Sequence, residues 1–110
     1  MGLRDRFRRD RPGVARTARD ADVEHLETFA ADRKGVEGFI EPETSTTTTT
    51  LVLVAGDGEW TRRRVASRDA AFDLGRRLAL PVYDVAATGY PSRMRAWTAA
   101  RKAAGEQRST

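Results

Sequence analysis

The fold is decided by one stretch of the chain, residues 51–97, with the sequence LVLVAGDGEWTRRRVASRDAAFDLGRRLALPVYDVAATGYPSRMRAW. It holds an apolar strand pattern, a glycine-containing acidic turn, two helical patterns and most of the aromatic residues. Its first four residues, Leu51–Val54, are apolar on both faces of a strand, which predicts a central strand that helices cover on one side. We therefore expect the folded core to form around this strand.

The acidic turn, Gly56–Glu59, predicts a β-hairpin. Glycine permits the positive φ angles that tight hairpin turns require. The threonines that precede Leu51 are β-branched and favour a strand, so the first arm of the hairpin is predicted over Thr46–Ala55, at the centre of the sheet. The returning arm is predicted over Trp60–Val65.

The chain before the hairpin predicts a helix and a strand. Apolar residues recur at helical spacing from Val14 to Lys34, and Gly35 is placed to end this helix. From Val36 to Glu41 the side chains alternate until Pro42 interrupts the pattern. Proline cannot donate to a strand ladder, so this segment is predicted as a short edge strand.

The chain after the hairpin predicts helix, strand and helix. Ser67 is placed to cap a helix that ends before Pro81, with Ala71, Leu74 and Leu78 on its buried face. Val82–Val85 is predicted as a short strand, reached by a right-handed crossover. A last helix is predicted after Pro91, and it carries a stripe of residues that we expect to pack on the core: Tyr90, Met94, Trp97 and Arg101.

These patterns predict an α+β fold: an N-terminal helix, a three-stranded antiparallel meander, then helix, strand and helix packed on the sheet. The length of 110 residues suits one domain, which we place over residues 14–104. The charged residues 1–13 are predicted to be a disordered basic arm, and residues 105–110 a frayed end.

Charge is divided into three blocks along the sequence. Residues 1–20 have a net charge of +4, residues 21–43 of −5 and residues 44–110 of +5. The basic residues are nearly all arginine, a bias that GC-rich codons also produce. Two interpretations stay open: the basic residues form one surface, or they pair with the acidic segment 22–43.

Several classes of site find no support in the residues. The chain has no cysteine, which excludes disulfides and thiolate zinc sites. His25 has no second histidine to share a metal and is predicted to lie at the surface. No cofactor and no small-molecule substrate are indicated, and no signal peptide or membrane-spanning stretch is recognised, so we expect a cytoplasmic protein without membrane contact.

The candidate interaction surface combines aromatic and arginine side chains. Along the returning strand, Trp60, Arg62 and Arg64 should share one face. The last helix adds Tyr90 and Trp97, with Arg93, Arg95 and Lys102 expected to face solvent. Aromatic residues with arginines are typical of protein interfaces and of surfaces that bind nucleic-acid strands. The alternative is that the strand arginines pair with Glu41, Glu43 or neighbouring acids.

Three functions are compared on this basis. The favoured one is a non-enzymatic interaction protein, which binds another protein or self-associates through the aromatic and arginine surface. The second is nucleic-acid binding by the strand from Trp60 to Arg64. The third is a degenerate nuclease, because the order helix, three strands, helix, strand resembles the restriction-endonuclease-like core. That activity needs clustered carboxylates and a lysine, whereas Asp57 and Glu59 lie in a turn and Thr61 stands at the lysine position.

Four phrases resemble a family of small actinobacterial proteins of unknown function: GVEGFIEP, TLVLVAGDGEWTRRRV, PVYDV and GYPSRMRAW. The resemblance covers about residues 20–98. It implies a self-contained domain in an actinobacterial cytoplasm, and it implies no mechanism.

Overall fold

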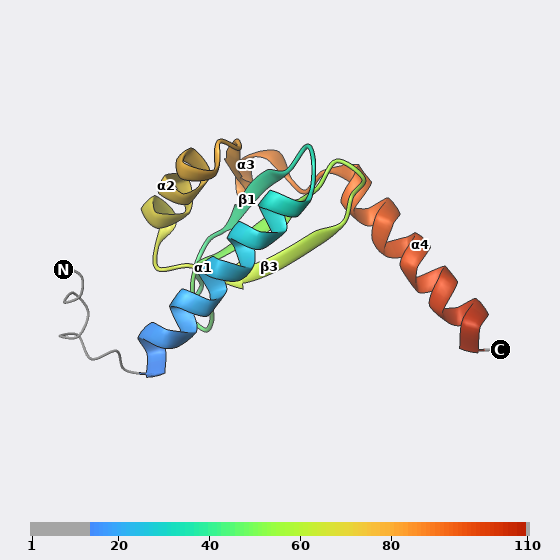
Figure 1. The fold of residues 1–110 in the computed structure, drawn as a ribbon, viewed down its shortest axis with the longest axis horizontal. Helices are drawn as coiled ribbons and strands as arrows, with labels where there is room; N and C mark the ends of the chain where they lie inside the picture. The colour runs from blue at the N-terminus through green and yellow to red at the C-terminus, as the bar shows by residue number, and fades with distance from the viewer. Residues whose placement is uncertain (1–13, 110) are drawn as a thin grey trace.

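The structure is a computed structural model that describes residues 14–109, and the basic arm predicted over residues 1–13 lies outside the described residues. The α+β class is confirmed (Figure 1). In chain order the elements are α1 (Val14–Asp32), β1 (Glu37–Glu41), β2 (Thr50–Val54), β3 (Trp60–Arg64), α2 (Arg68–Leu78), β4 (Val82–Asp84), α3 (Val85–Thr88) and α4 (Ser92–Ser109).

The four strands form one sheet in the order β3-β2-β1-β4. The first three make the predicted antiparallel meander, and β4 pairs parallel to β1, with Gly38 opposite Val82. The prediction of β1 as an edge strand was wrong, because the α2 crossover returns the chain to its free side. Pro42 follows the last residue of β1 and so takes no place in the ladder.

Strand β2 begins at Thr50, four residues later than predicted. The threonines before it form a local loop instead. The hydroxyl of Thr44 accepts hydrogen bonds from the backbone N–H groups of Thr46 and Thr47, at 3.2 and 3.1 Å. Such local bonds compete with strand pairing, and they outweigh the strand preference of a β-branched run.

The predicted turn and helix cap are both present. Gly58 adopts a φ of +98° in the β2–β3 turn, a conformation that favours glycine. Ser67 caps α2, and its hydroxyl accepts a 3.0 Å hydrogen bond from the N–H of Ala70. These local signals therefore fix where β3 begins and where α2 starts.

The core lies on both faces of the sheet. Helices α1 and α2 cover the first face, where Leu26, Ile40, Leu51, Leu53 and Leu74 are buried together. On the second face Phe39, Val52, Val54 and Met94 are buried, with Trp60 and Val85 packed against them. Residues Leu51–Val54 of β2 are therefore all apolar because each face of the sheet has its own cluster.

Helix α4 extends away from the rest of the molecule (Figure 1). Its start packs on the sheet through Met94, which is buried, and half-buried Trp97 lies beside Gly58 of the β2–β3 turn. From Ala99 to Ala103 every side chain is exposed, and the helix continues past Gly105 to Ser109. Within residues 14–109, none of the helices combines the length and the apolar character that crossing a membrane needs.

Candidate functional site

The side chains of β3 alternate as predicted, and Arg62, whose side chain is 43% exposed, is bound by a carboxylate of β1. Its Nε and Nη2 atoms donate to the two carboxylate oxygens of Glu41, at 2.7 and 2.9 Å. The guanidinium also lies 5.3 Å from the ring centre of Trp60. A fork of two parallel hydrogen bonds is a strong form of ion pair. The alternative in which this arginine pairs with Glu41 is therefore the one observed.

Glu41 joins three strands to the segment before α4. Besides Arg62 it accepts a 2.6 Å hydrogen bond from the hydroxyl of Thr50 and another from the phenol of Tyr90. Burial raises the pKa of Glu41, but the hydrogen bonds from Arg62, Thr50 and Tyr90 outweigh it, so this pKa lies below its ordinary value. Burial and the same carboxylate raise the pKa of Tyr90. The cluster stays charged and closed at neutral pH.

The prediction that Arg93 faces solvent was wrong. Its Nε donates to the carbonyl of Ala55 at 2.9 Å, and its Nη2 donates to Glu37 at 2.8 Å. The first turn of α4 passes directly over the β2–β3 turn, where a Cβ on Gly58 would lie 2.1 Å from the carbonyl oxygen of Arg93. This close approach brings the arginine to the carbonyl end of β2, which no sequence pattern indicated.

The remaining candidate residues fall into two places. The indole of Trp60 donates a 2.8 Å hydrogen bond to the hydroxyl of Thr98, and Arg101 stacks 5.1 Å from the ring centre of Trp97. Trp60, Trp97 and Arg95 therefore belong to the region around α4, where Arg95 is exposed. Arg64 is also exposed, but it lies at the opposite end of β3. Arg64 is therefore separated from the residues around α4.

The acidic segment pairs with the basic one inside the molecule. Four of the seven acids in residues 21–43 form ion pairs with arginines of residues 44–110. These pairs are Asp22–Arg63, Glu27–Arg77, Glu37–Arg93 and Glu41–Arg62. Much of the charge that is separated along the sequence is therefore paired in the folded molecule. This pairing leaves fewer arginines available to a ligand.

His25 is half-buried between α1 and β3, whereas the sequence predicted a surface position. Its Nε2 lies 2.6 Å from the hydroxyl of Thr61. Burial lowers the pKa of His25, and the positive charges of Arg63 and Arg33 lower it further. The ring is therefore held as a neutral hydrogen-bonding group of the interface.

A groove that the sequence did not indicate lies beside α4. It has a volume of about 320 Å³ and mostly apolar walls, and it is lined by Tyr90, Met94, Arg95, Thr98, Ala99 and Lys102. Apart from Tyr90, which precedes α4, these residues recur at helical spacing on one side of the helix. The only sequence signal was the series of small residues in the last helix, which is also what an ordinary solvated helix contains.

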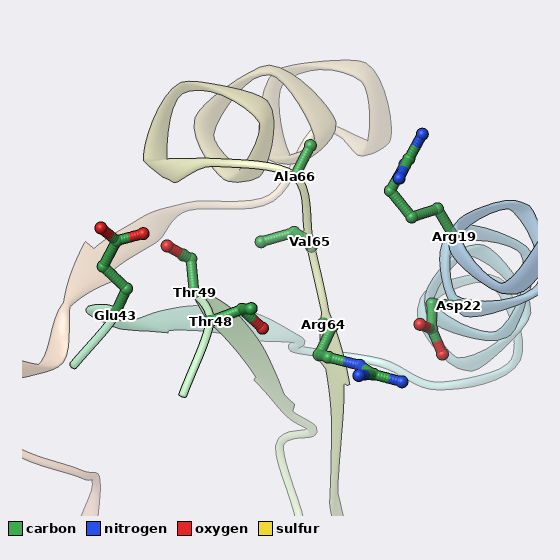
Figure 2. Close-up of a pocket in the computed structure, with 8 residues that line it drawn as sticks. All are labelled: Arg19, Asp22, Glu43, Thr48, Thr49, Arg64, Val65 and Ala66. Carbon is green, nitrogen blue, oxygen red and sulfur yellow. The ribbon is translucent and has the colours of Figure 1, made fainter. Parts of the chain in front are cut away.

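A second hollow, of about 370 Å³, lies between the start of α1, the threonine loop and the end of β3 (Figure 2). Figure 2 shows that its walls carry both signs of charge: Arg19 and Asp22 lie together on α1, Arg64 extends toward Asp22, and Glu43 lies on the opposite side of the hollow. The two cations and two anions cancel formally. The hollow therefore has no net charge with which to select a phosphate group.

The element order that motivated the nuclease comparison is present as α1, β1, β2, β3, α2, β4. The carboxylates, however, are engaged elsewhere. Glu59 accepts a 2.8 Å hydrogen bond from Arg33, and Asp84 pairs with Arg68. Thr61, at the position where a catalytic lysine was sought, contacts His25. Among the described residues, no three side chains of metal-ligating type are grouped as a metal site would need.

Comparison with known proteins gave no family, no curated protein and no solved structure that matches this chain.

Proposed function

We propose that this chain is a non-enzymatic interaction protein that binds a protein helix in the groove beside α4. The main observation in its favour is that α4 continues beyond its contacts with the sheet, and every side chain from Ala99 to Ala103 is exposed. A short helix without packing is only marginally stable in water, even when it is rich in alanine. A partner that covers this part of α4 would stabilise it.

The groove suits a helix better than a small ligand. Its lining follows α4 for about two turns, from Met94 to Lys102. Thr98 and Ala99 at its centre permit close approach of another backbone. Helix-in-groove recognition uses anchors at this spacing. The polar groups, Arg95 and Lys102, stand along the length of α4 and do not converge on one point, as a small-molecule site would require.

The proposal departs in one respect from the surface that the sequence indicated. Arg93 is bound to Glu37 and fixes the start of α4 against the sheet, whereas Arg62 is bound to Glu41, the carboxylate that also holds Tyr90 before α4. Trp60 has the same role as Arg93 through its hydrogen bond to Thr98. Tyr90 and Arg95 remain on the proposed binding surface, because both line the groove.

Site-specific photo-crosslinking in the native host tests the proposal. The photoreactive residue p-benzoylphenylalanine replaces Ala99, which lines the groove, or Ala100, which lies about 100° further around the helix. We expect protein adducts from position 99 and few from position 100. Equal labelling at the two positions, or no adduct at position 99, would contradict the proposal.

Nucleic-acid binding is a second candidate, and the observation that favours it also lies on α4. Residues 92–105 contain four basic and no acidic side chains. Fluorescence anisotropy of labelled single-stranded and duplex oligonucleotides tests it at two salt concentrations. Binding that weakens steeply with salt and is lost in the Arg95→Glu, Lys102→Glu variant would support it, since displaced counterions make such affinity electrostatic. No binding at low salt would exclude it.

A further inference from the structure

We infer that the helix received by the α4 groove is α1 of a second copy of this chain. The inference rests on the proposed function and specifies its partner. It joins two surfaces that the fold leaves open: the groove side of α4 and the outer side of α1.

The outer side of α1 carries small and acidic residues, which suit a groove lined by small and basic residues. Its exposed residues recur at helical spacing on one stripe, which consists of Asp20, Ala21, Glu24, Thr28 and Ala31. The small members of this stripe permit close packing against another helix. The larger members, Asp20 and Glu24, are both acidic.

The groove side of α4 complements this stripe. Arg95 and Lys102 are exposed and separated by Thr98 and Ala99, so small residues again lie between long charged ones. Acidic and small residues on α1 therefore face basic and small residues on α4. Opposite charges at the rim of a helix contact favour the correct partner and orientation.

The α1 stripe is long enough to cover the groove. From Asp20 to Ala31 it extends about 16 Å at 1.5 Å per residue, whereas the groove extends about 12 Å along α4, from Met94 to Lys102. Within one molecule α1 is packed on the first face of the sheet through Leu26 and Phe29, while α4 starts on the second face. We therefore place the contact between two molecules.

A two-fold dimer uses the contact twice, since α1 of each copy meets α4 of the other. This doubles the area that one contact buries, which favours a stable dimer, since stable interfaces bury roughly 1,200 Å² or more in total. It also closes the assembly, whereas the same contact repeated without a two-fold axis would build a filament.

Charge reversal on one helix at a time gives the test. One variant carries Asp20→Arg and Glu24→Arg on α1, and the other carries Arg95→Glu and Lys102→Glu on α4. All four side chains are exposed, so both variants should keep the circular dichroism spectrum and thermal midpoint of the wild type. Sedimentation equilibrium then measures the mass of each protein alone and of an equimolar mixture.

We expect the wild type to reach twice its monomer mass and each variant alone to associate at least tenfold more weakly. The mixture should recover the dimer, because both of its α1–α4 contacts pair opposite charges. A control variant with the same charge change at Glu43 and Asp73 should dimerise alone like the wild type. A monomeric wild type, or a mixture that stays monomeric, would overturn the inference.

The photo-crosslinking experiment separates this inference from the proposed function. An adduct at position 99 with twice the mass of the chain supports both. An adduct of another mass overturns self-association and leaves the groove as a binding site for a different protein. No adduct overturns both.

Discussion

Individual arginines of this chain have different roles that depend on their neighbours. Arg62 and Arg64 are adjacent on the same face of β3, yet the first is bound to Glu41 and the second is exposed at the rim of the hollow in Figure 2. Strand alternation predicts that the two share a face. It does not predict that Glu41 binds only one of them. Glu41 is the last residue of β1 and lies opposite Thr50, and in the described contacts it pairs with Arg62 and not with Arg64.

Replacing these two arginines separately should have unequal effects. Arg62→Ala removes two hydrogen bonds to a carboxylate that is mostly shielded from water, and we expect the free energy of unfolding to fall by about 1 kcal/mol, since partial exposure of Arg62 weakens the pair. Arg64→Ala should change it by less than about 0.5 kcal/mol. Urea denaturation of both variants measures the difference, and equal losses would show that the Glu41 cluster has no special weight.

Secondary-structure elements were predicted well where local chemistry decides them. The Ser67 cap, the Gly58 turn and the apolar strand Leu51–Val54 are all in their expected places. The sequence failed where tertiary contacts decide. Strand β1 is interior because β4 returns to it, and Arg93 turns inward because α4 crosses the β2–β3 turn. The spacing of apolar residues in the sequence indicates neither of these contacts.

Two glycines in helices should respond in opposite ways to the same substitution. Gly75 in α2 lies against β4, where an added Cβ would be 2.3 Å from a methyl group of Val82. Gly75→Ala should therefore lower the free energy of unfolding by roughly 1–3 kcal/mol in spite of the better helix propensity of alanine. A urea titration that found no loss would show that β4 moves aside easily.

Gly105 in α4 is the matched control. A Cβ there meets no atom within 4 Å, so Gly105→Ala has only the propensity gain of up to about 1 kcal/mol locally. The expected result is a stronger helical signal in circular dichroism with no loss of stability. A weaker helical signal would contradict the assignment of an unpacked helix at this position.

At the scale of the whole molecule, acid should destabilise the fold in two stages. His25 has a lowered pKa when folded, so the unfolded chain binds the proton first as the pH falls below the ordinary value of 6.5. Glu41 and Glu59 also have pKa values below the ordinary value of 4.5. Their charged forms therefore stabilise the fold above pH 4.5, and this stabilisation is lost as the pH falls further. The free energy of unfolding should decline gently below pH 6.5 and more steeply below pH 4.5.

Chemical denaturation between pH 8 and pH 3.5 measures this profile. His25 is the only histidine, and His25→Asn keeps a polar partner for Thr61 without a titrating ring. The variant should lose the first stage and keep the second. A wild-type profile that is flat down to pH 4.5, or a first stage that survives in the variant, would contradict the assignment.

The parallel pairing of β4 with β1 has a consequence for the order of folding. Strands β1, β2 and β3 are joined by short connections. The pairing of β4 with β1, in contrast, brings together Gly38 and Val82, which are 44 residues apart in the chain. Contacts between distant residues form late, because the connecting chain loses more freedom when they close. We expect the meander to assemble first and β4 to complete the sheet last. During that interval the outer edge of β1 is open, and in a crowded solution another unfinished chain competes with β4 for it.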